Sequence, residues 1–192
     1  MFDDTIQKRI NELDERLVNY SDKELMFQER QSEGKMKIIL ELSNPCVMFR
    51  DVDENCLNYF KCKKTADCIV FEQKTNCNWA LHIFEMKRTV KSKEWAKIQE
   101  QFKGAYYNAL SIAGFLGIND VINETKLYTC FLNDKMSVDS LEMHAVLADS
   151  NDGAKSWRKG IVNIDGFELK KYPMEKLQVD DSCEMRYIMN GE

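Results

Sequence analysis

The centre of the chain holds two apolar runs, at residues 66–71 and 79–87, that are rich in β-branched and aromatic residues and therefore favour strands. A short polar segment between them suits a hairpin. After these two runs in the sequence, apolar residues recur at intervals of three and four over residues 92–116, which predicts a long amphipathic helix. The run at 126–132 is expected to return beside the first two. The order strand, strand, helix, strand predicts an α/β fold with a mixed central β-sheet flanked by helices.

The N-terminal segment has a helical pattern in two pieces. Apolar residues at alternating four and three spacing over 3–20 predict an amphipathic helix, which either packs onto the sheet or seeds a homodimer. Ser21 and Glu24 have the spacing of a capping box, and they predict a second helix as far as Gln31. Gly34 is expected to end that helix.

Shorter strands are predicted on both sides of the centre. After Asn133, short apolar runs alternate with Asn-Asp-Gly and Asp-Gly turn signals, which predicts strand-rich structure. Residues 1–132 are therefore expected to form a helical N-terminus with the α/β core. Residues 133–192 are expected to extend the sheet or to form a small accessory region. The earlier strands are predicted at 35–42, 46–49 and 57–63.

The cysteines and the apolar runs indicate the compartment. The 192 residues contain seven cysteines, an odd number, without any Cys-x-x-Cys, so they are interpreted mainly as small hydrophobes in a reducing compartment. No run approaches the apolar length of a membrane span, and the start of the chain lacks a signal-peptide pattern, which predicts a cytoplasmic protein. A zinc or iron-sulfur site is the alternative, but its spacing matches no standard pattern; its ligands would be Cys56, Cys62, Cys68 and Cys77.

Three side chains suited to metal and phosphate chemistry lie on the two central runs. Because successive strand residues point to opposite faces, Glu85 and Lys87 project together from the second run. Antiparallel pairing around the turn would place Asp67, on the first run, beside Glu85. Two carboxylates so placed suit Mg²⁺ or Mn²⁺, hard ions that take oxygen ligands. The lysine could orient or deprotonate the attacking water and offset charge on the phosphorane.

This pattern resembles the PD-(D/E)XK nuclease superfamily over about residues 35–132. The resemblance implies that Asp67 is the first acid, Glu85 the second and Lys87 the lysine. The Met86 carbonyl would also reach the metal. The resemblance further implies a restriction-endonuclease-like core, Mg²⁺ or Mn²⁺ as the cofactor, and hydrolysis of phosphodiester bonds.

The chain departs from the pattern of the superfamily at two points. Thr65 and Ala66 precede Asp67, where many members have a proline. An acid from an N-terminal helix often completes the metal site of the superfamily, and Glu29 or Glu33 can serve here. The Gln and Tyr that some branches carry on the following helix are matched only approximately, by Gln99, Gln101, Tyr106 and Tyr107.

Sequence context, and not the tripeptide Glu-x-Lys alone, distinguishes Glu85 from other glutamates. Only Glu85 combines an apolar strand before it, an aspartate upstream on another strand and a long helix after it. The nearest rival, Glu168 with Lys170, has no following helix. The alternative interpretation is that Asp67 and Glu85 are strand-end residues in contact with solvent, with an exposed lysine of little energetic consequence. The tripeptide Glu-x-Lys occurs five times, at residues 33–35, 72–74, 85–87, 124–126 and 168–170.

The charge distribution favours nucleic acid near this site. The net charge of −5 argues against a protein that coats nucleic acid non-specifically. Residues 61–103, however, carry ten Lys and Arg against five Asp and Glu. These cations either track a phosphate backbone or form a solvated basic face. The cations expected to hold the backbone are Arg88, Lys91, Lys93, Lys97 and Lys103.

The sequence thus predicts a metal-dependent nuclease that acts first of all on DNA. A second copy of the chain or a partner protein is a further expected partner, and no membrane is expected. A non-catalytic partner-binding or nucleic-acid-binding module on the same scaffold is the second hypothesis. A small-ligand-binding domain, with the C-terminal strands as its lid, is the third. His82 and His144 lie within apolar runs and are interpreted as satisfied, buried histidines rather than catalytic groups.

Overall fold

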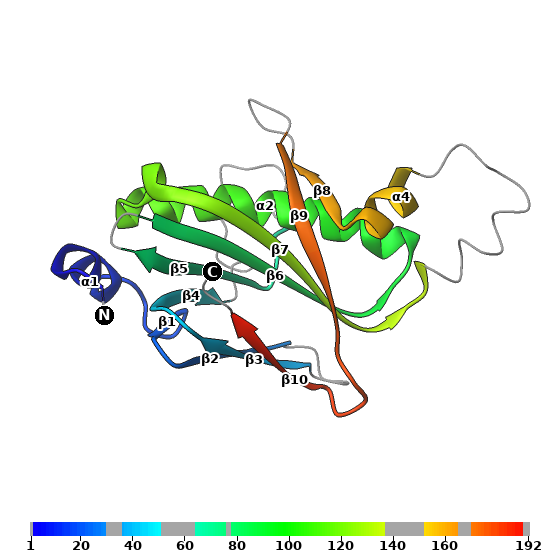
Figure 1. Ribbon diagram of the computed structural model, residues 1–192, viewed down its shortest axis with the longest axis horizontal. Coiled ribbons are helices and arrows are strands. Elements are labelled where there is room, and N and C mark those ends of the chain that lie inside the picture. The colour runs from blue at the N-terminus through cyan, green and yellow to red at the C-terminus, as the bar shows by residue number, and fades with distance from the viewer. Residues whose placement is uncertain are drawn as a thin grey trace, which may run out of the picture.

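The described part of the protein is built from a large mixed sheet, a small sheet and three α-helices (Figure 1). The computed structural model describes residues 2–29, 36–50, 64–75, 78–136, 152–164 and 170–189. The helices are α1 (Asp4–Asn11), α2 (Ser92–Leu116) and α4 (Asp152–Lys159), with a 3-10 turn η1 (Asn119–Val121). The strands are β1 (Val18–Ser21), β2 (Glu24–Gln28), β3 (Lys37–Leu42), β4 (Cys46–Arg50), β5 (Cys68–Thr75), β6 (Asn78–Val90), β7 (Ile122–Asp134), β8 (Ile161–Ile164), β9 (Lys170–Gln178) and β10 (Glu184–Met189).

The large sheet has seven strands in the order β1-β4-β5-β6-β7-β9-β8. Strands β4, β5 and β6 form an antiparallel meander. Helix α2 then crosses over the sheet, so that β7 runs parallel to β6. This is the predicted order of strand, strand, helix and strand, and the expectation of a mixed α/β fold is confirmed. The C-terminal strands β9 and β8 extend the same sheet beyond β7.

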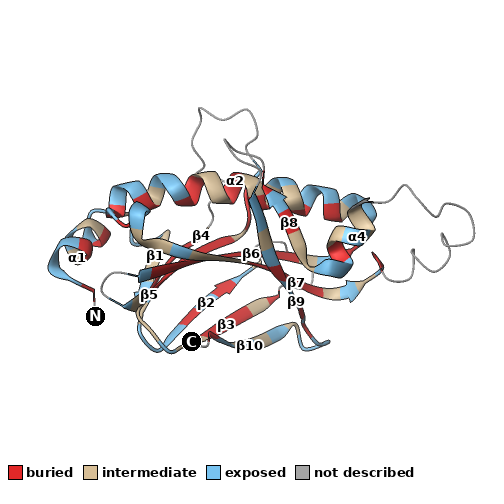
Figure 2. Ribbon diagram, turned by 45° about the horizontal axis from the view of Figure 1, so that its top comes forward, coloured by how far each residue is buried: buried red, intermediate tan, exposed pale blue. Residues whose placement is uncertain are grey.

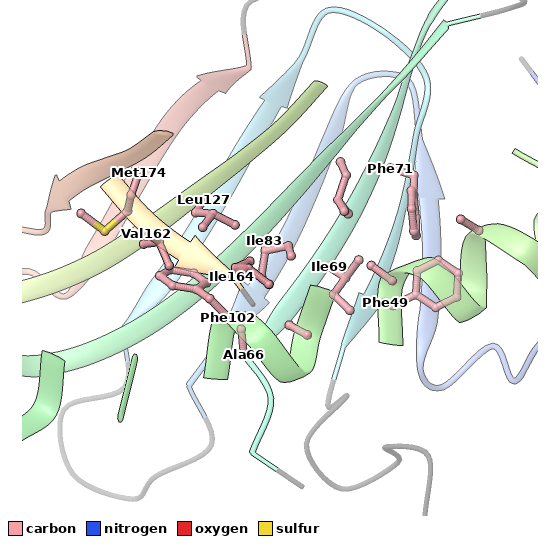
Figure 3. Packing of buried hydrophobic residues seen from close by; sticks show 14 of the residues in the cluster. Phe49, Ala66, Ile69, Phe71, Ile83, Phe102, Leu127, Val162, Ile164 and Met174 are labelled. Carbon is pink, nitrogen blue, oxygen red and sulfur yellow. The ribbon is translucent and has the colours of Figure 1, made fainter. Parts of the chain in front are cut away.

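The two faces of the large sheet bury different partners (Figures 2 and 3). One face packs against α2, where Ile69 and Ile83 of the sheet meet Phe102 of the helix. The other face packs against the small sheet, where Phe84 meets Phe27 of β2 with ring centroids 5.3 Å apart. Alternate residues of β5 and β6 therefore belong to different cores, which is why these strands are apolar almost throughout.

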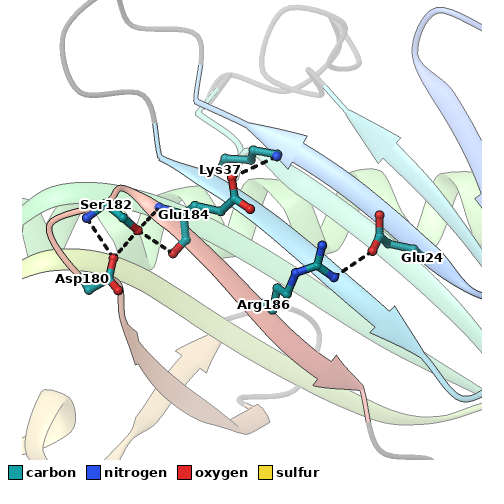
Figure 4. Close-up of polar contacts among 6 residues, drawn as sticks. All are labelled: Glu24, Lys37, Asp180, Ser182, Glu184 and Arg186. Carbon is teal, nitrogen blue, oxygen red and sulfur yellow. Dashed lines mark hydrogen bonds and ion pairs between the residues drawn. The ribbon is translucent and has the colours of Figure 1, made fainter.

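The small sheet, in the order β10-β3-β2, joins segments that are far apart in the sequence. Strand β10 runs parallel to β3, and cross-strand ion pairs fix its register (Figure 4). Lys37 Nζ lies 3.0 Å from Glu184 Oε2, and Arg186 Nη1 lies 3.1 Å from Glu24 Oε2. These pairs are solvent-exposed, so they contribute to register more than to the free energy of folding.

The helix predicted over 92–116 is confirmed in full. Gly117 ends it with φ +73°, a left-handed conformation that glycine adopts without a steric penalty. The first N-terminal helix is shorter than predicted, since α1 ends at Asn11 and Val18 already pairs with β4. Its Ile6 and Ile10 are buried against the large core, as expected for a helix that packs onto the sheet.

The second predicted N-terminal helix is wrong. Glu24–Gln28 forms strand β2, in which Leu25 and Phe27 are buried and their neighbours exposed, so the period is two and not 3.6. Ser21 Oγ accepts hydrogen bonds from the backbone N–H groups of Lys23 and Glu24, at 3.1 and 3.2 Å. The Ser-x-x-Glu spacing therefore marks a turn between two strands, because the hydroxyl of serine caps a tight turn as readily as a helix.

Several predictions fall on residues outside the described ranges. These are the strand at 57–63, the cysteines Cys56, Cys62 and Cys77, and the histidine His144. The C-terminal part is strand-rich as expected, but it also contains α4, which was not predicted. None of the described helices combines the length and apolar character that crossing a membrane requires.

Candidate functional site

Asp67 and Glu85 stand opposite each other across the β5–β6 hairpin. Cys68, the first residue of β5, pairs with Phe84 in the antiparallel ladder, so the same register continued by one residue brings Asp67 opposite Glu85. Ile69 and Ile83 pack against α2, and the alternation of side chains assigns Asp67 and Glu85 to the same face as these two residues. Asp67 Oδ2 accepts a hydrogen bond of 2.6 Å from the backbone N–H of Met86, which holds the aspartate against β6.

Lys87 connects this buried position with the solvent. Its Nζ forms an ion pair with Glu85 Oε1 and donates a hydrogen bond of 3.2 Å to the Met86 carbonyl. The side chain of Lys87 is 26% exposed, whereas that of Glu85 is fully buried. The ammonium group therefore lies between a dry carboxylate and water.

The second oxygen of Glu85 is the unusual atom of the site. Oε2 is buried and has no hydrogen-bond partner within the described residues. Burial raises the pKa of Glu85 well above its ordinary value, and the Asp67 carboxylate raises it further. A buried carboxylate oxygen without a partner is costly, and either a proton or a cation would stabilise it.

Helix α2 supports the site from above the sheet. Gln101 lies close enough to lower the pKa of Glu85 through a hydrogen bond, and its Nε2 donates to the Thr65 carbonyl at 3.4 Å. Gly104 packs directly on the backbone that leads into Asp67, since a Cβ added there would lie 1.9 Å from the Lys64 carbonyl oxygen. The glycine thus permits a helix–strand approach that no larger residue would allow.

A third acid, Glu29, follows β2 and interacts electrostatically with the site. Burial raises the pKa of Glu29 and so does Asp67, whereas Lys87 and Arg88 lower it. These interactions place Glu29 among the charged groups of the site. The other acid considered, Glu33, lies outside the described residues. Nothing in the local sequence distinguished the two, because the position of Glu29 depends on the unpredicted strand β2.

The basic residues of the central block are not equivalent. Arg88, Lys91, Lys93 and Lys97 are exposed and follow one another from the end of β6 into the first turns of α2. Lys103 is only half-exposed and lies near the middle of the helix. The four exposed cations therefore form a continuous basic segment just beyond Lys87, whereas Lys103 stands apart from it.

A second buried carboxylate, Glu72, lies on the opposite face of the same hairpin. His82 Nε2 lies 3.0 Å from its Oε2, and Asn44 Nδ2 donates to its Oε1 at 2.8 Å. Lys74 Nζ lies 3.3 Å from Oε2, and the other ring nitrogen of His82 is 3.0 Å from the Tyr128 hydroxyl. Burial alone would raise the pKa of Glu72, but the hydrogen bonds from His82 and Asn44 hold it at about 2. His82 is thus a satisfied, buried histidine, as predicted.

The donor set at Asp67 and Glu85 fits a hard divalent cation. It offers two carboxylates and the Met86 carbonyl, with one buried oxygen that lacks a partner. Mg²⁺ commonly binds through one or two carboxylates and keeps several waters, so a complete protein cage is not required. Within the described ranges, no three His, Cys, Asp or Glu side chains converge as a ready-made metal cluster. The chain matches no protein-family model, no curated protein and no solved structure.

Proposed function

We propose that the protein is a metal-dependent nuclease that hydrolyses phosphodiester bonds of DNA, with Asp67 and Glu85 as ligands of Mg²⁺ or Mn²⁺. The observation that carries this proposal is the buried Oε2 of Glu85, which has no hydrogen-bond partner among the described residues and lies across the hairpin from the Asp67 position. An acid directly before a core strand, a neighbouring strand with Glu-x-Lys and a following crossover helix also agree with the resemblance to the PD-(D/E)XK superfamily.

In this proposal Asp67, Glu85 and the Met86 carbonyl would hold the metal, which supplies Lewis-acid polarisation of the scissile phosphate and a more acidic bound water. Lys87 acts as a cation. Although burial favours its neutral form, Glu85 and Asp67 raise the pKa of Lys87 above its usual value. Lys87 therefore orients the attacking water and offsets the charge on the phosphorane, and it is poorly suited to removing a proton.

Two neighbours complete the machinery. Glu29 supplies a further carboxylate at the edge of the site, where it can hold a water of the metal by hydrogen bonding. Gln101 lies near Glu85 and donates to the Thr65 carbonyl, so it would support the position of the second ligand. The basic segment at Arg88, Lys91, Lys93 and Lys97 would hold the DNA backbone on the solvent side of Lys87.

A cytoplasmic location belongs to the same proposal. Cys46, Cys130 and Cys183 are free thiols, and Cys46 and Cys130 are buried within the core beside the small sheet. Buried, unpaired thiols of this kind are what a reducing compartment favours.

The direct test is cleavage of supercoiled plasmid in Mg²⁺ by the wild type and by Glu85→Gln and Lys87→Met. Each variant should lose about 100-fold or more of the cleavage rate, because each removes a group that contacts the metal or the phosphate. The matched controls are Glu124→Gln and Lys126→Met, which alter an exposed Glu-x-Lys pair on β7. Equal cleavage by all five proteins, or no cleavage by the wild type in Mg²⁺ or Mn²⁺, would reject the proposal.

One observation favours the alternative of a non-catalytic nucleic-acid-binding module. Lys87 already forms an ion pair with one oxygen of Glu85, so the charge of this carboxylate is partly compensated without a metal. In that case the wild type binds DNA without cleaving it, and Glu85→Gln binds equally well.

A further inference from the structure

We infer that a cavity at the far end of α2 is a binding site for a small amphipathic anion, with an apolar body and one carboxylate or comparable acid group. The cavity has a volume of about 370 Å³ and lies between the chain after α1, the end of β4 and the second half of α2. A volume of roughly 300–1,000 Å³ is typical of small-molecule sites. Its position on α2 separates it from Gln101 and from the candidate nuclease site.

The walls of the cavity are apolar. Its lining includes Leu13, Leu17, Val18, Phe49, Ile112 and Phe115. Phe115 is 47% exposed, which is unusual for so large an apolar side chain and places an open apolar surface at the cavity. The described polar side chains of α2 on this wall are turned to the helix itself: Asn108 Nδ2 donates to the Gly104 carbonyl at 2.9 Å, and Ser111 Oγ donates to the Tyr107 carbonyl at 3.1 Å.

Among the described residues, the charged groups at the cavity leave one unbalanced cation, Arg50. Asp14 is neutralised by Arg16, whose Nε and Nη2 donate to the two carboxylate oxygens at 2.9 and 2.5 Å. This pairing lowers the pKa of Asp14 to about 2. Arg50 has no carboxylate partner among the described residues, and its Nη2 donates to the Arg16 carbonyl at 3.0 Å.

The guanidinium of Arg50 therefore retains unused donors. Its Nε is buried without a hydrogen-bond acceptor in the described part of the chain. A planar guanidinium binds carboxylates through paired hydrogen bonds, and such a bond is stronger where water is scarce. A cationic ligand would not find a free carboxylate there, because Asp14, the one acid among the described lining residues, is already paired with Arg16. The charge and the apolar lining together select an amphipathic anion.

The test is titration calorimetry with decanoate, and with decyltrimethylammonium as a probe of the same chain length and opposite charge. The wild type should bind decanoate saturably and the cation at least about tenfold more weakly. Arg50→Gln should weaken decanoate binding roughly tenfold or more. Lys126→Gln, which removes the same charge from an exposed site on β7, should leave the affinity unchanged.

Two variants that fill the cavity with a tryptophan side chain test whether the cavity is the binding site. Ile112→Trp and Ser111→Trp place an indole on its α2 wall, and each should abolish decanoate binding while circular dichroism shows a folded protein. Ser111 is exposed, so its variant should fold even if the one at half-buried Ile112 does not. Absence of saturable decanoate binding by the wild type, equal binding of the two probes, or unchanged binding by a folded filled variant would overturn the inference.

Discussion

The two Glu-x-Lys tripeptides of the central hairpin, Glu72 with Lys74 and Glu85 with Lys87, have the same local sequence pattern and opposite physical states. Both glutamates are buried, at 1% and 0% exposure, and both pair with the lysine two residues on. They lie on opposite faces of the sheet. The number of further partners is what separates them.

Glu72 is fully satisfied by its protein surroundings. His82, Asn44 and Lys74 occupy its two oxygens, and its pKa is held at about 2. Glu85 has one oxygen without a hydrogen-bond partner in the described part of the chain, and burial raises its pKa. A buried charge that is completely hydrogen-bonded belongs to the framework of the fold, whereas an incompletely bonded one is a candidate for binding chemistry. The contrast shows that burial and a neighbouring lysine do not identify a site on their own.

The largest difference should appear in the stability of leucine variants. Glu72→Leu leaves His82, Asn44 and Lys74 without their acceptor, so the free energy of unfolding should fall by about 3 kcal/mol or more. Glu85→Leu removes a desolvated carboxylate and leaves only Lys87, which can reach water, so the change should stay within about 1 kcal/mol. Urea unfolding of both variants measures this difference. Equal losses would show that Glu85 is as much a part of the framework as Glu72.

The support of the site by α2 should have the next largest effect. Gly104→Ala forces a Cβ against the Lys64 carbonyl, so the free energy of unfolding should fall by about 1–3 kcal/mol and the cleavage rate should fall with it. Gly114→Ala is the matched control on the same helix, because no atom lies within 4 Å of the added Cβ. That variant should be stabilised by roughly 0.5–1 kcal/mol. A Gly104→Ala variant as stable and active as wild type would contradict the packing described for Asp67.

The smallest effect expected is the pH dependence of the contribution that Glu72 makes to the free energy of unfolding. Its folded pKa of about 2 is below the ordinary value of 4.5, so its contribution to stability is present above pH 4.5 and is lost as the pH falls toward 2. The stability difference between wild type and Glu72→Gln should therefore shrink by about 1 kcal/mol between pH 6 and pH 3.5. Chemical unfolding at both pH values provides the measurement. A difference that grows on acidification would mean that Glu72 is not held ionised.

The sequence was sufficient for those parts of the fold that depend on local periodicity. Alternation along the two central runs placed Asp67, Glu85 and Lys87 on one face, because the side-chain period of a strand needs no knowledge of its neighbours. The helix over 92–116 was equally accessible from its spacing and its terminal glycine. The metal, the DNA substrate and the catalytic roles stay predictions.

Non-local contacts explain what the sequence did not reveal. Ser21 and Glu24 suggested a helix, but strand β2 is stabilised by pairing with β3, which in turn pairs with β10 from the other end of the chain. The presence of Glu29 at the site follows from that pairing. Gln101 was noted only as an approximate match, and its approach to Glu85 depends on how closely Gly104 lets α2 pack. No local pattern reports such distances.

The central claim is that a divalent cation binds the Glu85 carboxylate and does not bind the Glu72 carboxylate. Thermal unfolding with and without Mn²⁺ tests this claim most directly. Saturating Mn²⁺ at about 100 times its Kd should stabilise the wild type by about 2.7 kcal/mol, or roughly 5–10 °C in Tm. Glu72→Gln should start from a lower Tm and show the same rise, whereas Glu85→Gln should show less than about half of it. A rise in Glu85→Gln equal to that of the wild type, or no rise in the wild type, would contradict the account.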